Sequence, residues 1–132
     1  MSVKVIIPKL IKPPPSKKEV LAARIISKHF NHTVEFLIPI DNYKRKTPDI
    51  AMAGLLWEIK SPVGSSVKTT INDQVKTALK QSVNIIIDTQ YTPIPDVAIL
   101  KQLANIIKLH KRLNKLLIIS KGGKVIVVYS RK

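Results

Sequence analysis

Two carboxylates and one lysine between Thr47 and Pro62 have the residue types and spacing of a metal-assisted catalytic centre. Asp49 follows a proline, and Glu58 and Lys60 stand two residues apart in a later apolar run. Carboxylate oxygens suit hard divalent cations, and a nearby ammonium group can stabilise charge in a transition state. We therefore expect magnesium or manganese as the cofactor. Zinc is the poorer fit, because the chain has no cysteine.

A tight hairpin is the local structure that positions these residues. Residues 49–52 and 55–60 read as two strands joined by a two-residue turn, and a turn of that length fixes the register. The register places Asp49 directly opposite Glu58, at a distance between Cβ atoms of roughly 5 Å. Because side chains alternate along a strand, Glu58 and Lys60 share one face of the hairpin.

The overall charge points to polyanionic partners. The 132 residues include 23 Lys and Arg against 8 acids, a net charge of +15, and 45% are hydrophobic. A charge of this size argues for nucleic acid or an acidic protein. No apolar run reaches the roughly 20 residues of a membrane-spanning helix. We expect one domain over 1–132, with a lead-in strand and Pro-rich linker in 1–15 and the core in 16–132.

The remaining periodicities and turn signals predict a mixed α/β sheet flanked by helices. The expected elements are a strand at 3–7, a helix from the capping box Ser16–Glu19 to Phe30, a strand at 33–38, a helix at 67–81, a buried central strand at 83–87, a helix from an Asp96 cap to Leu113, and a hairpin of 116–119 and 125–129 across a primed turn at Gly122-Gly123. Asp73 and Asp88 are expected to be solvated or strand-end acids.

The Pro48-Asp49 pair, followed by Glu58-Ile59-Lys60, resembles the signature of the PD-(D/E)xK nuclease superfamily. The order of elements over residues 16 to 88 is similar to the restriction-endonuclease-like core of that superfamily. The resemblance implies that Asp49 and Glu58 bind the metal and that Lys60 assists the attacking water. It also implies catalytic roles for Glu19 on the preceding helix and Gln74 on the following one. Glu19 has a competing role in the capping box.

The segment from Trp57 to Pro62 and the small basic domain also resemble the C-terminal tRNA nuclease toxin domains of contact-dependent growth inhibition (CdiA-type) proteins. That resemblance implies an endonuclease acting on RNA, with tRNA preferred, and a cognate acidic immunity protein as a partner. It also implies export as part of a larger protein and activity in the target-cell cytoplasm.

Several cations are candidates for substrate binding. Lys44, Arg45 and Lys46 directly precede the metal-site strand, where they could hold phosphates beside the scissile one. A second set is expected to follow one stripe of the final helix, with Lys111 beside it: Lys101, Lys108, Arg112 and Lys115. Contacts of this kind give affinity without reading a base sequence.

Two other functions are compatible with the same residues. Recognition by shape and charge suits duplex DNA as well as folded RNA, so a PD-(D/E)xK DNA endonuclease is one alternative. The other is a non-catalytic basic module that only binds nucleic acid. In that case Glu58 and Lys60 would form an ordinary surface ion pair, but two acids inside a basic surface would repel phosphate unless a metal bridged them.

Overall fold

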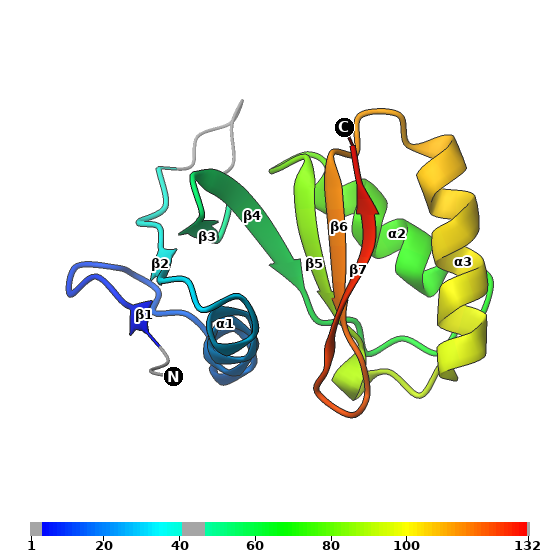
Figure 1. Ribbon diagram of the computed structural model, residues 1–132, viewed down its shortest axis with the longest axis horizontal. Helices are drawn as coiled ribbons and strands as arrows, with labels where there is room; N and C mark the ends of the chain where they lie inside the picture. Colours follow the sequence, from blue (N-terminus) through cyan, green and yellow to red (C-terminus); the bar gives the residue numbers. More distant parts are fainter. Residues whose placement is uncertain (1–3, 41–46, 132) are drawn as a thin grey trace.

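The computed structural model describes residues 4–40 and 47–131. These residues form one seven-stranded sheet with helices on both faces (Figure 1). None of the helices in these ranges is long and apolar enough to cross a membrane. The elements are β1 (Val5–Ile6), α1 (Lys17–Phe30), β2 (Val34–Phe36), β3 (Ile50–Met52), β4 (Leu55–Lys60), α2 (Thr70–Ala78), β5 (Asn84–Asp88), the 3-10 helix η1 (Thr89–Tyr91), α3 (Asp96–Leu109), β6 (Lys115–Ile119) and β7 (Val125–Ser130).

The sheet is mixed, and its strands lie side by side in chain order from β1 to β7. β4, β5 and β6 are parallel, β2–β3–β4 and β6–β7 are antiparallel, and β1 runs parallel to β2. All five residues of β5 are buried, which confirms the predicted central strand and is typical of parallel strands covered on both faces. The expected lead-in segment joins the sheet through β1.

Two hydrophobic clusters divide the core between the faces of the sheet. One packs beneath α1 and includes Ile26, Trp57 and Ile86. The other packs beneath α2 and α3 and includes Ile85 and Ile87. Consecutive residues of β5 therefore serve opposite clusters, as the alternation of a strand requires, and Figure 1 shows α1 apart from the α2–α3 pair.

The predicted hairpin of β3 and β4 is confirmed. Its turn residues, Ala53 and Gly54, have φ angles of +52° and +76°, as a two-residue type I′ turn requires. Met52 pairs with Leu55, as expected from the length of the turn. The Trp57 indole nitrogen also donates a hydrogen bond to the Met52 carbonyl at 3.3 Å, which ties the hairpin to its own core face.

The capping box at the start of α1 is also confirmed. Glu19 N–H donates to Ser16 Oγ at 3.2 Å, and Ser16 N–H donates to Glu19 Oε1 at 2.9 Å. Two helix-terminal donors are thereby satisfied. At the other end, Asn31 takes the left-handed conformation with φ +55° and closes the helix.

Both later helices are shorter than predicted. α2 begins at Thr70 because residues 67–69 form a turn. α3 ends at Leu109, before the expected Leu113, because the chain must turn there to enter β6. Leu113 is buried, and the Asn114 N–H pairs with the Val83 carbonyl at 2.8 Å. Asp96 is the first residue of α3 and not its cap, a position that Pro95 occupies.

The predicted primed turn at Gly122-Gly123 is wrong. Only Gly123 of this pair has a positive φ, +78°, and its N–H donates to the Ser120 carbonyl at 2.9 Å. The residues between β6 and β7 leave room for an ordinary turn followed by one left-handed glycine, which is the usual form of a longer hairpin loop.

Candidate functional site

The site begins with the first residue before β3. The Asp49 N–H donates to the Trp57 carbonyl at 3.0 Å, which carries the hairpin pairing beyond the last strand residue. Asp49 Oδ2 accepts a hydrogen bond from the Ile59 N–H at 2.9 Å. The carboxyl group of Asp49 is therefore held against β4, close enough to the Glu58 carboxyl group for each to shift the pKa of the other.

Glu58 is the buried member of the pair. Glu58 is only 2% exposed. Glu58 and Lys60 face the α2 side of the sheet, whereas Trp57 and Ile59 pack beneath α1 on the other side. Glu58 Oε2 lies 3.4 Å from Lys60 Nζ. Glu58 Oε1 is buried without a hydrogen-bond partner among the described residues. An orphaned carboxylate oxygen deep in a protein is costly and is a position where a cation would fit.

The electrostatics of the pair favour one shared proton. Burial, followed by the charge of Asp49, raises the pKa of Glu58 to about 8, against a smaller lowering by Lys60. Burial also raises the pKa of Asp49, but the Ile59 N–H lowers it. Because the Asp49 charge has that backbone donor, Glu58 holds the proton at neutral pH. Two carboxyl groups this close titrate as a pair.

A small pocket with a few polar side chains in its lining opens beside Asp49. Its volume is about 170 Å³. Glu19 reaches it from α1 and Gln81 from the connection after α2, and the negative charge of Glu19 contributes to the raised pKa of Asp49. The rest of the lining is apolar or proline: Ile11, Pro13, Pro14, Pro15, Phe36, Leu37, Pro39 and Pro48, together with Thr47.

The structure places Gln81 beside the candidate site, and not the predicted Gln74. Gln74 is half-buried on α2 and does not line this pocket. Gln81, just beyond α2, lines it and accepts a hydrogen bond from Lys60 Nζ at 3.5 Å. No spacing rule singles out Gln81, because it lies in the connection to β5 and reaches Lys60 through the fold of the chain.

The predicted basic stripe is corrected by the early end of α3. Lys101 and Lys108 are exposed on α3, and Lys111 is exposed in the turn that follows. Arg112 lies beyond the helix and donates to the Leu79 carbonyl at 3.2 Å. Lys115 lies in β6 and donates to Ser130 Oγ at 2.6 Å. The other predicted cations, Lys44, Arg45 and Lys46, lie outside the described residues.

A second buried acid was missed. Asp88 was expected to be a solvated or a strand-end acid. It does stand at the end of β5, but it is completely buried and not solvated. Its Oδ1 accepts two hydrogen bonds from Gln90, at 3.1 and 3.0 Å, while Oδ2 has no partner among the described residues. Burial raises the pKa of Asp88 above its usual value. It lies on the α1 face, away from the Asp49–Glu58 pair.

The residues of the candidate site fit a hard divalent cation held by few protein ligands. Within residues 4–40 and 47–131, no group of three His, Asp or Glu residues is arranged to hold a metal. Magnesium commonly uses only one or two carboxylates and keeps several waters. Asp49 and Glu58 supply two, and the buried Glu58 Oε1 has no partner among the described residues, so it is free to serve as a ligand.

Comparison with known proteins identifies the class. A family model described as the contact-dependent growth inhibition CdiA C-terminal domain matches residues 46–125. The chain belongs to that family and is a toxin domain of contact-dependent growth inhibition. No curated protein matches the chain.

A solved structure supports the same fold. It is described as a CdiA-CT/CdiI toxin and immunity complex from Burkholderia pseudomallei. The match covers 94% of this chain and 97% of that chain, with a TM-score of 0.61 and 18% sequence identity. At that identity the likeness establishes the mixed α/β fold and nothing finer.

Proposed function

We propose that this toxin domain is a metal-dependent endonuclease of PD-(D/E)xK type that hydrolyses phosphodiester bonds of RNA. The observation that carries the proposal is the pairing of half-buried Asp49 with buried Glu58, with Lys60 Nζ 3.4 Å from Glu58. An ion pair between Glu58 and Lys60 with a purely structural role does not need Asp49, which raises the pKa of Glu58. A centre that binds a cation needs both carboxyl groups, and perturbed carboxyl groups beside a pocket are typical of functional sites.

The residues divide the chemical work among them. Asp49 and deprotonated Glu58 would hold magnesium or manganese, which when bound supplies Lewis acidity and an activated water. Lys60 places a positive charge beside the reacting phosphate and stabilises the charge that develops there. Gln81 holds the Lys60 ammonium group through the hydrogen bond at 3.5 Å. Glu19 adds a further carboxylate beside Asp49.

RNA, with tRNA preferred, is the substrate we favour. The net charge of +15 suits any nucleic acid, and recognition by shape suits a compact folded RNA. The preference over DNA comes from the resemblance to toxin domains that cut tRNA. The exposed Lys101, Lys108 and Lys111 are candidates for phosphate contacts away from the site.

An acidic immunity protein is the partner we propose. The similar structure from Burkholderia pseudomallei is a complex of a toxin and its immunity protein, and the basic surface of this chain suits an acidic one. We further propose that the domain is exported within a larger protein and acts in the cytoplasm of the target cell.

A cleavage panel tests the proposal. The protein would be incubated with tRNA, ribosomal RNA, plasmid and single-stranded DNA, each with magnesium, manganese, zinc or a chelator. We expect RNA cleavage with magnesium or manganese and none with the chelator. Glu58→Gln should abolish cleavage, whereas Asp73→Asn, a matched loss of an exposed carboxylate on α2, should leave it intact. Undiminished cleavage by Glu58→Gln or with the chelator would refute the proposal.

A further inference from the structure

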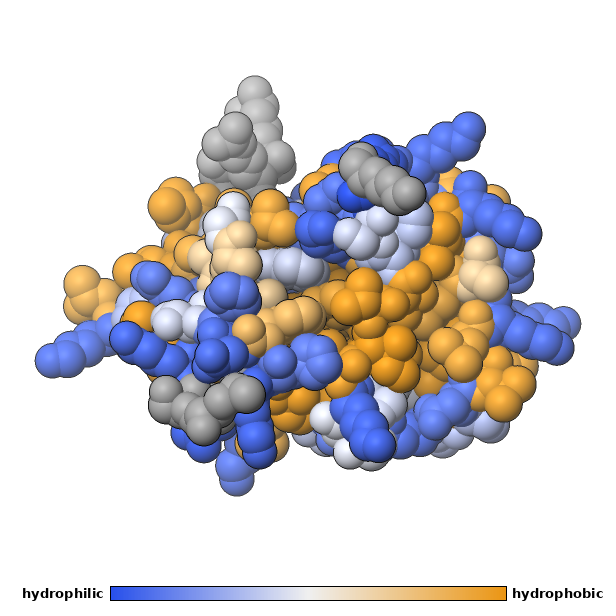
Figure 2. Space-filling view, viewed as in Figure 1, coloured by the Kyte–Doolittle hydropathy of each residue, from blue (hydrophilic) through white to orange (hydrophobic). Residues whose placement is uncertain are grey.

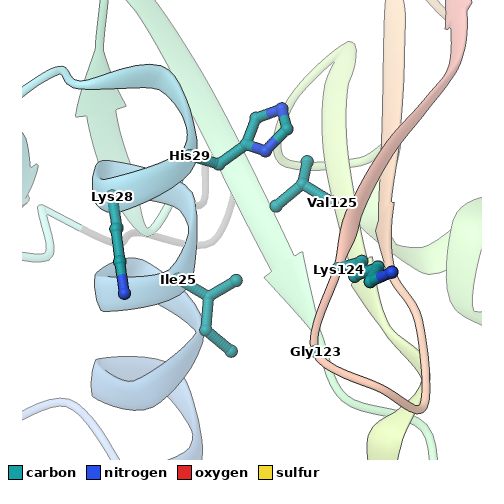
Figure 3. A pocket seen from close by; sticks show the side chains of 6 residues that line it. All are labelled: Ile25, Lys28, His29, Gly123, Lys124 and Val125. Atoms are coloured by element: carbon teal, nitrogen blue, oxygen red, sulfur yellow. The ribbon is translucent and has the colours of Figure 1, made fainter.

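A second hollow lies between the last turns of α1 and the start of β7 (Figure 3). Its volume is about 720 Å³, within the range of roughly 300–1,000 Å³ typical of ligand sites. We name it the α1–β7 groove. Its lining residues are Ile25, Lys28, His29, Gly123, Lys124 and Val125.

The groove combines an apolar floor with cationic sides. Ile25 and His29 project from α1 towards β7, and Val125 projects back towards the helix (Figure 3). Lys28 comes from the helix and lies along it, and Lys124 comes from the loop before β7 with its ammonium group pointing away from α1, so the two cations stand at different rims of the groove (Figure 3). None of the described residues that line the groove is an acid. Hydrophobic surface also lies over β7, where Ile126 and Val127 are exposed (Figure 2).

The cations of the groove lack an internal counter-charge. In the part of the chain that the structure describes, Glu58–Lys60 is the single ion pair. Lys28 and Lys124 are both exposed, and Arg24 is exposed on the preceding turn of α1. Positive charges gathered in this way repel one another, and an anion lying between them would remove that repulsion.

We propose that the α1–β7 groove binds a backbone phosphate of a nucleic acid together with the adjacent sugar or base. The proposal rests on the proposed nuclease function and adds a substrate subsite to it. The two exposed lysine side chains would turn inward to contact the phosphate, while the apolar floor and the His29 ring would contact the sugar or base, since bases commonly stack on aromatic rings. A hollow of this size suits a nucleotide better than the broad surface of a protein partner, about 800 Å² on each side.

The groove and the candidate site share one helix. Glu19 lines the pocket beside Asp49 near the start of α1, and Lys28 lines the groove near its end. Nine residues of helix correspond to about 14 Å along its axis. One nucleotide cannot span that distance, so the groove would hold a part of the substrate away from the scissile bond and contribute to binding more than to the chemical step.

Binding measurements on paired charge variants test this subsite. Lys28→Gln with Lys124→Gln would be compared with Lys68→Gln with Lys76→Gln, which removes the same charge from exposed positions outside the groove. The probe is a short fluorescein-labelled single-stranded RNA in chelator, followed by anisotropy over a range of salt concentrations. We expect the groove pair to lose affinity roughly tenfold and to lower the salt slope by about 0.7, the value for one phosphate contact on a single strand. The control pair should change both much less.

The other outcomes separate the two proposals. Equal weakening by both pairs would reduce the effect to net charge and overturn the groove inference, while cleavage by the wild type would leave the nuclease proposal intact. If the groove pair lost binding to an acidic polypeptide such as polyglutamate but bound RNA as the wild type does, the groove would be assigned to a protein partner. That result would also overturn the groove inference. Absence of RNA binding and of cleavage by the wild type would overturn both proposals.

Discussion

Lys60 Nζ lies 3.4 Å from Glu58 Oε2, and among the described residues this is the one ion pair. In a chain with 23 basic residues and 8 acids, the pair is not a product of abundant carboxylates. The lysine lowers the pKa of Glu58, yet burial and the Asp49 charge raise it more, to about 8. Glu58 would therefore lose its proton when a cation binds beside it.

The stability of the metal-free protein should fall as the pH rises from about 4.5 to about 8. The pKa of Glu58 is raised from its ordinary value of 4.5 in the unfolded chain to about 8 in the folded protein, so the folded state binds more protons within that window. Its contribution is fully present below the unfolded pKa and is lost as the pH rises through the folded one. We expect a loss on the order of a few kcal/mol, measured by urea unfolding in chelator at a series of pH values.

Glu58→Gln is the matched test of this pH dependence. The amide keeps the shape of a neutral carboxyl group and cannot ionise, so the slope between about pH 4.5 and 8 should flatten. Asp88 is also buried with a raised pKa, and a slope that persists in Glu58→Gln but disappears in Asp88→Asn would assign the effect to Asp88.

Removal of the Lys60 ammonium group should affect cleavage far more than folding. Lys60→Ala takes away one group that stabilises charge in the transition state, and losses of this kind cost roughly 100- to 1,000-fold in rate. Glu58 would become neutral more readily without the lysine, so the melting temperature should stay within a few degrees. Rates would be measured on tRNA at saturating magnesium. The control, Lys76→Ala on the exposed side of α2, should retain the wild-type rate.

Glu19 can be separated into a capping residue and a site residue. Glu19→Gln keeps the hydrogen bond to the Ser16 N–H, because glutamine also completes a capping box, but it removes the charge beside Asp49. We expect unchanged stability and a roughly tenfold or greater increase in the magnesium concentration needed for half-maximal cleavage. Glu19→Ala should also lose about 1 kcal/mol of stability. Equal magnesium dependence in Glu19→Gln and the wild type would leave Glu19 with the capping role alone.

The turn that sets the register of the site can be improved. Ala53 has a φ of +52°, a left-handed conformation that costs an L-residue roughly 1–2 kcal/mol. Ala53→Asn creates the Asn-Gly pair favoured in type I′ turns and should stabilise the protein by about 1 kcal/mol in urea unfolding. Ala104→Asn, on the exposed side of α3, should instead destabilise it, because asparagine is a poorer helix former than alanine.

The sequence predicts the local parts of the site well, because short-range rules determine them. The two-residue turn alone places Asp49 beside Glu58, and strand alternation alone places Lys60 on the Glu58 side. The capping box of Ser16 and Glu19 follows from their spacing in the same way. Each of these relationships involves residues that are close to one another in the chain.

The features that the sequence misses depend on distant parts of the chain. Gln81 reaches Lys60 across 21 residues. α3 ends at Leu109 because the next residues must pair with the segment just before β5, through the hydrogen bond from the Asn114 N–H to the Val83 carbonyl. Asp88 is fully buried at the end of β5, although nothing in its local sequence distinguishes it from a solvated acid. The hydrophobic periodicity of one segment does not predict which of its residues a distant segment will bury.

The order of the strands has a consequence for how the domain acquires its structure. Every strand from β2 to β7 pairs with the strand before it in the chain, so the sheet can grow in one direction without waiting for a distant partner. Folding is faster when contacting segments are close in sequence. A chain that emerges from a narrow passage with its N-terminus first could add each strand to an edge already in place. The last strand to arrive, β7, would also complete the wall of the α1–β7 groove.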